Sequence, residues 1–298
     1  MGIENSNAHY LPAALIGGFG EAPRRGRHAR SLRNAKVAVR YTSQPDAVHA
    51  RVRADSIARE KGIYRLKNPP AGVDRDEIDR LWSSYEPRLP AAVRALEAGR
   101  KHVRDSDWST IRAHLYGLAV RHPDFDKRAR TFLLEQGVPD PHPDLVQHER
   151  VRTLRETPKL LAACRFALLR SGDASRFIVN DKGYTTVKDE SDHRGILFPL
   201  SGSVAILAAV DVGMISGRPE AWLSGEGLLT PGATELLNEA AWRQPGIRCV
   251  IGHPRDAMRL RNLGVQRDLV MPILGPYGSR GTDGLFDWAF APEHPTTR

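Results

Sequence analysis

Apolar residues between Asp74 and Gly99 recur at steps of three and four, a spacing that places them on one face of a helix. Asp74 is a suitable N-cap, and Gly99 is a suitable residue to end the helix. Pro87 and Pro90 fall inside this segment, and each lacks the amide donor that an inner helical turn needs. The pattern therefore predicts a helix that is kinked or split near Glu86.

The same periodicity continues through the middle of the chain. A second helix is expected to begin near Asp105 or Ser106 and to end by Pro123, with Trp108 and Leu115 turned inward. Two more segments have helical patterns, at 127–135 and at 145–169. Together these segments predict a helical layer over about residues 74–170.

Strand patterns lie on both sides of this layer. The run 36–41 (KVAVRY) alternates apolar and polar residues, which predicts a short half-buried strand. Segment 175–187 predicts two short strands around a tight turn at 180–183, because Asn-Asp-Lys-Gly favours turns. The remaining predictions are two apolar strands within 195–210 separated at 199–202, a helix at 234–242, a strand at 247–252 and a Gly/Pro-rich tail at about 275–298.

These elements predict a mixed α/β (α+β) fold. A central helical layer is expected to lie between an N-terminal strand and a mainly antiparallel C-terminal sheet formed by about residues 173–255. The chain has no internal repeat and no evident linker, so we expect a single domain over residues 1–298.

Composition supports a folded protein. The chain of 298 residues is 41% hydrophobic and 27% charged, which is ordinary for a globular domain. Cys164 and Cys249 each lie in an apolar stretch, so buried, unreactive thiols are expected. The sequence contains no apolar run of membrane-spanning length and its first residues do not fit a signal peptide, so we expect a cytoplasmic protein.

The net charge of +9 is concentrated near the N-terminus, because residues 21–61 hold eleven Lys/Arg and four Asp/Glu. Such a stretch attracts polyanions, so nucleic acid or a phosphate-bearing small molecule is a candidate partner. The alternative is a merely solvated basic face, since arginine is abundant throughout. The residues predicted to contact nucleic acid or phosphate are Arg24, Arg25, Arg27, Arg30 and Lys182.

The strongest enzyme signatures are absent from the sequence: it has no Walker lysine loop, no His-Glu-x-x-His, no Gly-x-Ser-x-Gly and no Cys-x-x-Cys. His9 and Tyr10 precede Pro12 and are candidate acid/base groups, although a packing role is the simpler interpretation. Asp181 is a candidate base or metal ligand, or only a good turn residue. Glu60 is a candidate functional carboxylate, or the exposed partner of neighbouring basic residues.

Two weaker candidates lie elsewhere. Residues 189–193 combine three acids and a histidine, which is a composition that suits a divalent cation, but a solvated loop is favoured. The glycines of 275–284 suit a phosphate cradle only weakly, because no helix with a Lys-Ser/Thr pair follows them. A divalent cation is therefore the one candidate cofactor, and its ligands are undefined.

Four groups of positions along the chain form a recognisable set. They are His9, Tyr10, Pro12 and Phe19; Ala58, Glu60, Gly62 and Tyr64; Phe177, Ile178 and Asp181; and Phe198, Pro199, Leu200 and Ser201. Together they resemble the bacterial family grouped as domain of unknown function number 4238. The resemblance covers about residues 9–255, and the chain departs from the family at Gly17, where the family has Arg, and at Lys182 and Gly183, where it has Asn-Pro. It implies that His9, Glu60 and Asp181 gather in one pocket, but it carries no established reaction.

Three functions from different classes fit these observations. The first is a hydrolase or nuclease-like enzyme that acts on a phosphate-bearing or nucleic-acid substrate through His9, Tyr10, Glu60 and Asp181, with or without a divalent ion. It requires His9 and Asp181 to approach within hydrogen-bonding reach in a cleft. The others are a non-catalytic nucleic-acid-binding protein that uses the basic 21–61 stretch, and a protein that binds a small metabolite in the family pocket.

Overall fold

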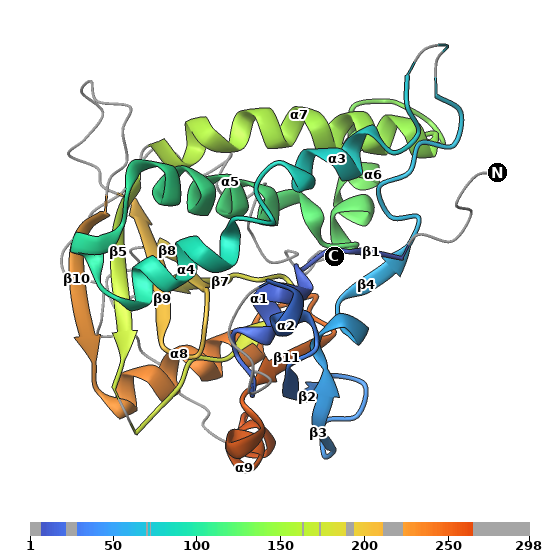
Figure 1. Ribbon diagram of the computed structural model, residues 1–298. Helices are drawn as coiled ribbons and strands as arrows, with labels where there is room; N and C mark the ends of the chain where they lie inside the picture. Colours follow the sequence, from blue (N-terminus) through green and yellow to red (C-terminus); the bar gives the residue numbers. More distant parts are fainter. Residues whose placement is uncertain are drawn as a thin grey trace.

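The computed structural model describes residues 7–21, 29–69, 71, 73–162, 164–172, 174–188, 194–210 and 223–264 (Figure 1). The fold is mixed α/β, as the sequence predicts, with a helical layer and antiparallel and mixed sheets. Over these residues, no helix combines the length and the apolar character that crossing a bilayer requires.

The helical layer forms where the periodicity predicts it. The expected split near Glu86 is confirmed, since one helix ends at Ser83 and the next begins at Leu89. The first of these begins two residues later than expected, with Asp76 at the N-cap position, and Asp74 instead accepts a hydrogen bond from the backbone amide of Asp76 (2.8 Å). The helices are α3 (Glu77–Ser83), α4 (Leu89–Glu97), α5 (Asp105–Arg121), α6 (Asp124–Glu135) and α7 (Pro143–Ala162), of which α5 and α7 lie side by side in Figure 1.

The helical prediction for 164–169 is wrong. Helix α7 ends at Ala162, and Cys164–Ser171 forms strand β5. This strand lies inside a sheet and is hydrogen-bonded on both edges, so an uninterrupted apolar run suits it as well as it suits a buried helix. Trp108 of α5 packs edge-on against Phe166 of β5, with ring centroids 5.3 Å apart, which fixes the helical layer on this sheet.

The C-terminal sheet has the order β10-β5-β9-β8-β7. Only the β10–β5 pair within it is parallel, so the prediction of a mainly antiparallel sheet is confirmed. Its other strands are β7 (Thr185–Lys188), β8 (Arg194–Pro199), β9 (Val204–Val210) and β10 (Leu223–Leu229).

A second sheet joins the two ends of the chain, in the order β3-β2-β11-β6. The N-terminal strand was expected on the far side of the helical layer, but it pairs directly with a C-terminal strand. It is also buried rather than half-buried, because it has a neighbour on each side. The four strands are β2 (Lys36–Tyr41), β3 (Val48–Arg53), β6 (Val179–Asn180) and β11 (Cys249–Gly252).

The turn at 180–183 connects the two sheets. The two predicted strands on either side of it exist as β6 and β7, but each belongs to a different sheet. The Asn180 side chain holds the turn, because its Oδ1 accepts hydrogen bonds from the amides of Lys182 and Gly183 (3.1 Å each) and its Nδ2 donates to the carbonyl oxygen of Tyr184 (2.9 Å). Asp181 therefore sits at the junction of the two sheets.

The remaining elements complete the fold around this junction. The N-terminal residues pair with the segment around Glu60, and Ala8 lies opposite Glu60 in the ladder. Helix α8 packs against strands of both main sheets. These elements are β1 (Asn7–His9), α1 (Ala13–Gly17), α2 (Ala29–Arg33), β4 (Arg59–Lys61), α8 (Pro231–Arg243), α9 (Ala257–Asn262) and short 3-10 helices at Ala54–Ser56, Arg100–His102 and Pro254–Asp256.

His114 is fully buried in α5, and within the described part of the chain neither ring nitrogen has a hydrogen-bond partner. Its ring lies edge-on to Tyr85, with centroids 6.1 Å apart. Burial, and after it the charge of Arg121, lowers the pKa of His114 to about 3. The imidazole is therefore neutral in the folded protein at neutral pH.

This histidine is expected to make stability depend on pH. Between its usual pKa of 6.5 and about 3, the unfolded chain binds a proton that the folded protein does not, so its contribution to stability is complete above pH 6.5 and is lost as pH falls. From pH 7 to pH 5 the free energy of unfolding should fall by about 2 kcal/mol through this residue.

Urea unfolding at a series of pH values would measure the effect. The His114→Phe variant should lose this part of the pH dependence, whereas the matched variant at the exposed His102, His102→Phe, should keep it. If the free energy of unfolding falls with pH equally in His114→Phe and in the parent protein, His114 does not cause the loss of stability at acidic pH.

Candidate functional site

Asp181 is completely buried, and its carboxylate accepts four hydrogen bonds from the described residues. One oxygen, Oδ2, accepts from the hydroxyl of Tyr10 (3.3 Å) and from Nε2 of His122 (3.1 Å). The other, Oδ1, accepts from the backbone amides of Arg248 (3.0 Å) and Cys249 (3.4 Å). Both oxygens are thus occupied by donors from three distant parts of the chain.

The hydrogen bonds of His122 define its protonation. Its Nδ1 accepts a hydrogen bond from the backbone amide of Asp124 (3.1 Å), so Nε2 carries the hydrogen that it donates to Asp181. No ring nitrogen is then left to take a proton from a substrate. Burial, and after it the Asp181 charge, raises the pKa of Tyr10, so the phenol also remains a donor. This arrangement braces the junction rather than forming a catalytic dyad.

Lys182 does not have the environment predicted for a phosphate-binding residue. Its side chain is only 3% exposed, and its ammonium group forms an ion pair with Asp124 (2.8 Å). The turn at the sheet junction carries Lys182 inward, so its charge is neutralised inside the protein. The structure corrects this prediction, because an external phosphate cannot reach the amine without breaking the pair.

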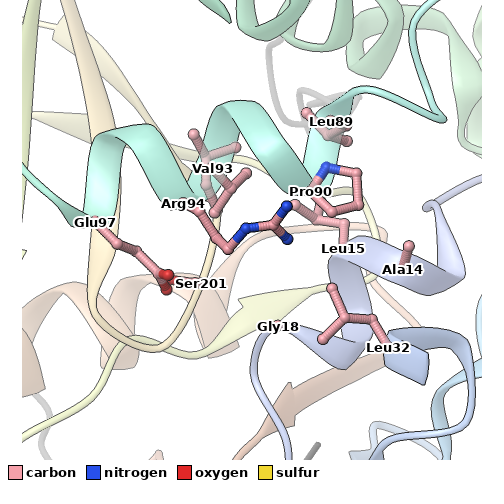
Figure 2. A pocket seen from close by; sticks show the side chains of 11 residues that line it. Ala14, Leu15, Gly18, Leu32, Leu89, Pro90, Val93, Arg94, Glu97 and Ser201 are labelled. Atoms are coloured by element: carbon pink, nitrogen blue, oxygen red, sulfur yellow. The ribbon is translucent and has the colours of Figure 1, made fainter. Parts of the chain in front are cut away.

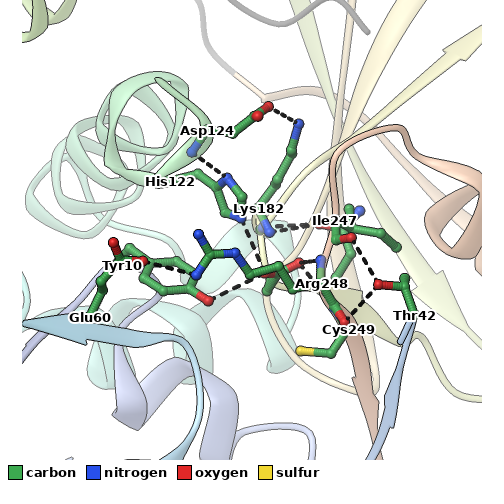
Figure 3. Close-up of polar contacts among 12 residues, drawn as sticks. Tyr10, Thr42, Glu60, His122, Asp124, Lys182, Ile247, Arg248 and Cys249 are labelled. Atoms are coloured by element: carbon green, nitrogen blue, oxygen red, sulfur yellow. Dashed lines mark hydrogen bonds and ion pairs between the residues drawn. The ribbon is translucent and has the colours of Figure 1, made fainter. Parts of the chain in front are cut away.

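Glu60 is connected to the Asp181 network through one arginine. Its carboxylate pairs with the Arg248 guanidinium (2.9 Å), which lies 5.9 Å from the centre of the Tyr10 ring. The structure therefore brings Glu60, Tyr10 and Asp181 into one region, and Figure 3 shows Glu60 and Tyr10 on either side of Arg248 there. Because Glu60 and Arg248 are both largely exposed, their ion pair contributes little to stability.

His9 lies outside this network. Its Nε2 lies 3.0 Å from the carbonyl oxygen of Asp55, and among the described residues no hydrogen bond joins it to Asp181. Adjacent side chains of an extended segment point to opposite sides, so Tyr10 reaches Asp181 and His9 does not. The expected contact between His9 and Asp181 is not formed.

A separate cavity of about 470 Å³ lies at the start of α1, and we call it the His9 cavity because charged residues in its lining act on the His9 imidazole, although His9 itself is not among the lining residues. Arg33 and Glu86 are in its lining, and their charges act on the His9 imidazole. Burial lowers the pKa of His9 below its usual value of 6.5. The hydrogen bond to the Asp55 backbone is the next largest effect and opposes this, and the charges of Arg33 and Arg121 lower the pKa further. Glu86 is held by an ion pair with the buried Arg121 (2.5 Å).

Since the only hydrogen-bond acceptor near Nε2 of His9 in the described chain is the Asp55 carbonyl, this nitrogen carries the hydrogen. Nδ1 then has a lone pair, and no hydrogen bond to it is formed by the described residues. His9 is therefore the predicted acid/base residue that remains chemically able to accept a proton.

Much of the predicted basic interface lies outside the described residues. Arg24, Arg25 and Arg27 fall there, and only the backbone of Arg30, in α2, is described. Within the rest of the stretch, Arg40 is buried. Its guanidinium donates hydrogen bonds to the carbonyl oxygens of Pro45 (2.6 Å), Leu260 (2.7 Å) and Leu263 (2.8 Å). Arg40 is thus a structural residue and not part of a basic surface.

Two further arginines of that stretch form ion pairs. Arg51 contacts Glu21 at 3.3 Å and Arg53 contacts Asp55 at 2.5 Å. These pairs reduce the positive charge that the described part of the stretch presents to a polyanion. Binding to nucleic acid stays a prediction, because it depends mainly on arginines that lie outside the residues described by the structure.

No metal site is evident in the part of the chain that the structure describes, where no group of three or more His, Cys, Asp or Glu side chains could hold an ion. The candidate cation-binding segment 189–193 and the glycine-rich segment 275–284 lie outside the described residues. Cys164 and Cys249 are buried as free thiols, as predicted, and burial raises the pKa of both.

No protein-family model, curated protein or solved structure matches this chain. The resemblance to the family of unknown function, and the shared pocket that it implies, therefore stay predictions.

Proposed function

We propose that this protein is an enzyme that hydrolyses a phosphate-bearing small molecule in the His9 cavity. The observation that carries the proposal is a cavity of about 470 Å³ whose lining includes Arg33, an arginine close enough for its charge to act on the neutral His9 imidazole. The Arg33 guanidinium makes no ion pair with the described residues, so it is available to bind a phosphate.

The roles follow from the contacts. Arg33 binds the phosphate oxygens, and Nδ1 of His9 accepts a proton from a water molecule as its oxygen attacks phosphorus. The bond from phosphorus to the leaving oxygen breaks, the leaving oxygen takes up a proton from solvent, and His9 releases its proton to solvent. The hydrogen bond from His9 Nε2 to the Asp55 carbonyl oxygen (3.0 Å) orients the ring, as a second partner commonly does for a catalytic histidine.

Asp181 and Glu60 have no part in this chemistry. Asp181 is buried with both oxygens occupied, and Glu60 is paired with Arg248. The proposed role of Asp181 is to hold β11, the turn at 180–183 and the N-terminal segment together, which positions the residues that follow Tyr10 along the cavity.

Hydrolysis of a panel of phosphate monoesters, diesters and nucleotides would test the proposal. The His9→Gln variant keeps an N–H donor for the Asp55 carbonyl but lacks a basic nitrogen, so kcat should fall about 100-fold or more. Arg33→Gln should mainly raise KM, by about tenfold.

The matched control is Glu60→Gln, which alters a conspicuous exposed carboxylate outside the cavity and should leave kcat and KM unchanged. Unchanged turnover in His9→Gln, or no hydrolysis of any ester by the parent protein, would refute the proposal.

A further inference from the structure

The lining of the His9 cavity includes a carboxylate, that of Glu86, in the link between α3 and α4. One of its oxygens, Oε1, pairs with the guanidinium of Arg121 (2.5 Å) and is enclosed by protein atoms. The Glu86 side chain is nevertheless 21% exposed, so the rest of the carboxylate faces the cavity that the residue lines. The other oxygen, Oε2, makes no hydrogen bond to the described residues, so it is able to accept one from a ligand.

Arg121 fixes the position of this carboxylate. Its side chain is buried, and besides pairing with Glu86 it donates hydrogen bonds to the backbone carbonyl oxygen of His9 (2.6 Å) and to the hydroxyl of Tyr85 (3.1 Å). A guanidinium held by three acceptors has little freedom to move. Glu86 is therefore ordered before a ligand arrives, and binding does not have to order it.

A serine hydroxyl lies close to Glu86 in the sequence and lines the same cavity. Ser83 is the last residue of α3, its side chain is exposed, and the described residues form no hydrogen bond with its hydroxyl. We call Ser83, Glu86 and the neighbouring lining residue Pro87 the α3–α4 wall. A carboxylate and a hydroxyl three residues apart suit a ligand that has hydroxyl groups of its own.

The α3–α4 wall is acidic, whereas the opposing charge is on α2. Burial raises the pKa of Asp79 of α3, the charge of Arg121 opposes this, and the nearby charge of Glu86 raises the pKa further. Two carboxylates this close repel an anionic group. A phosphate is therefore directed to Arg33 of α2, and an uncharged donor is favoured at the α3–α4 wall.

Apolar packing beside the cavity holds these two walls in place. Leu15 of α1, Leu32 of α2 and Leu89 of α4 are buried and line a space of only about 20 Å³ (Figure 2). Ala14 lines both this space and the His9 cavity, so the packed leucines lie next to the cavity. The separation of Arg33 from Glu86 is thus set by the packing of three helices, and it selects ligands that have an anion and a donor at matching distance.

The volume of the cavity also bears on the ligand. Pockets of about 300–1,000 Å³ enclose whole small molecules rather than single ions. A cavity of about 470 Å³ therefore has room for the phosphate and for the group that is esterified to it.

We propose that the substrate of the His9 cavity is a phosphate monoester of a polyhydroxylated compound, a sugar or polyol phosphate. Arg33 binds the phosphate, and Glu86 and Ser83 accept hydrogen bonds from the hydroxyl groups. This inference rests on the proposed function for its account of turnover, but the selective binding that it requires is measured without turnover.

Calorimetric titration of the full chain carrying His9→Gln tests the ligand class, because the proposed hydrolysis is suppressed and His9 is not a lining residue. The probes are sorbitol 6-phosphate, n-hexyl phosphate and 6-aminohexyl phosphate. They share a six-carbon chain and one phosphate, and they differ in whether the chain has hydroxyl groups, no polar group or an ammonium group. Sorbitol 6-phosphate should bind at least about tenfold more tightly than either of the others.

Substitutions in the α3–α4 wall should reduce this preference. Glu86→Gln keeps the shape of the side chain but not its charge, so it should weaken binding of sorbitol 6-phosphate about fivefold and leave n-hexyl phosphate unaffected. Ser83→Ala breaks no hydrogen bond with the described residues, so it should fold like the parent and weaken sorbitol 6-phosphate about threefold. Ser109→Ala, at an exposed serine of α5 outside the cavity, is the matched control.

Four results would overturn the inference: n-hexyl phosphate binds as tightly as sorbitol 6-phosphate, 6-aminohexyl phosphate binds most tightly, no probe binds, or the preference is the same in both wall variants and the parent. Turnover of the same esters by the protein with His9 intact separates this inference from the proposed function. Selective binding without any hydrolysis would refute the proposed hydrolysis and support the ligand class. Equal hydrolysis of sorbitol 6-phosphate and n-hexyl phosphate would support the hydrolysis and refute the ligand class.

Discussion

Replacing Asp181 by alanine is expected to destabilise the protein by about 3–5 kcal/mol, because it removes the acceptor of a buried network. The hydroxyl of Tyr10, Nε2–H of His122 and the amides of Arg248 and Cys249 would all lose their partner at once. These groups belong to the N-terminal segment, the helical layer and the second sheet, so the loss should affect global unfolding.

The Asp181→Asn variant separates the contributions of the two carboxylate oxygens. Its amide oxygen can still accept from the backbone amides of Arg248 and Cys249, and the Tyr10 hydroxyl can reverse to accept from the new NH₂ group. His122 cannot adapt in this way, because Asp124 holds its Nδ1 as an acceptor. A smaller loss of about 1–3 kcal/mol is therefore expected.

Denaturant unfolding of both variants would measure these differences. Glu60→Gln is the control, because it changes an exposed carboxylate of the same region and should alter stability by less than about 0.5 kcal/mol. A cost below about 1 kcal/mol for Asp181→Ala would contradict the structural role given to this residue.

Replacing Gly17 by alanine should destabilise the protein by about 3 kcal/mol. A Cβ at this position would lie 2.0 Å from the carbonyl oxygen of Leu32 and 2.6 Å from its carbonyl carbon. Because these are backbone atoms, α1 and α2 would have to separate, and the buried contacts between them would loosen.

Gly232 provides the matched control for this substitution. It lies in the first turn of α8 with no atom near its would-be Cβ, so Gly232→Ala should leave the fold intact and stabilise it by up to about 1 kcal/mol. Thermal and urea unfolding of both variants would measure the contrast. Equal stabilities for Gly17→Ala and Gly232→Ala would show that the two helices are not closely packed at Gly17.

The close contact at Gly17 also gives the physical reason for glycine at this position. An arginine there cannot be accommodated with α1 and α2 in this arrangement, so glycine is required by packing. Gly183 is restricted in a similar way: its φ is +79°, and a Cβ would lie 2.7 Å from the Leu118 side chain. At this position too, backbone conformation and packing require glycine.

The sequence alone determined the elements whose signal is local. The break between α3 and α4 follows from two prolines, and helix α5 follows from its apolar period. It also singled out His9, Tyr10, Glu60 and Asp181 as polar residues in apolar surroundings. These signals depend on neighbours within a few turns of chain, which a single sequence displays.

The tertiary structure decided what those residues touch. β2 pairs with β11 across more than 200 residues, and the pairing of β11 with β6 places Asp181 beside Arg248. Likewise, His122 and the His9 cavity depend on helix packing, and residues 164–169 become a strand because they gain partners on both edges. Side-chain partners separated by long loops leave no periodic trace in the sequence, because they form only when the sheets and helices pack.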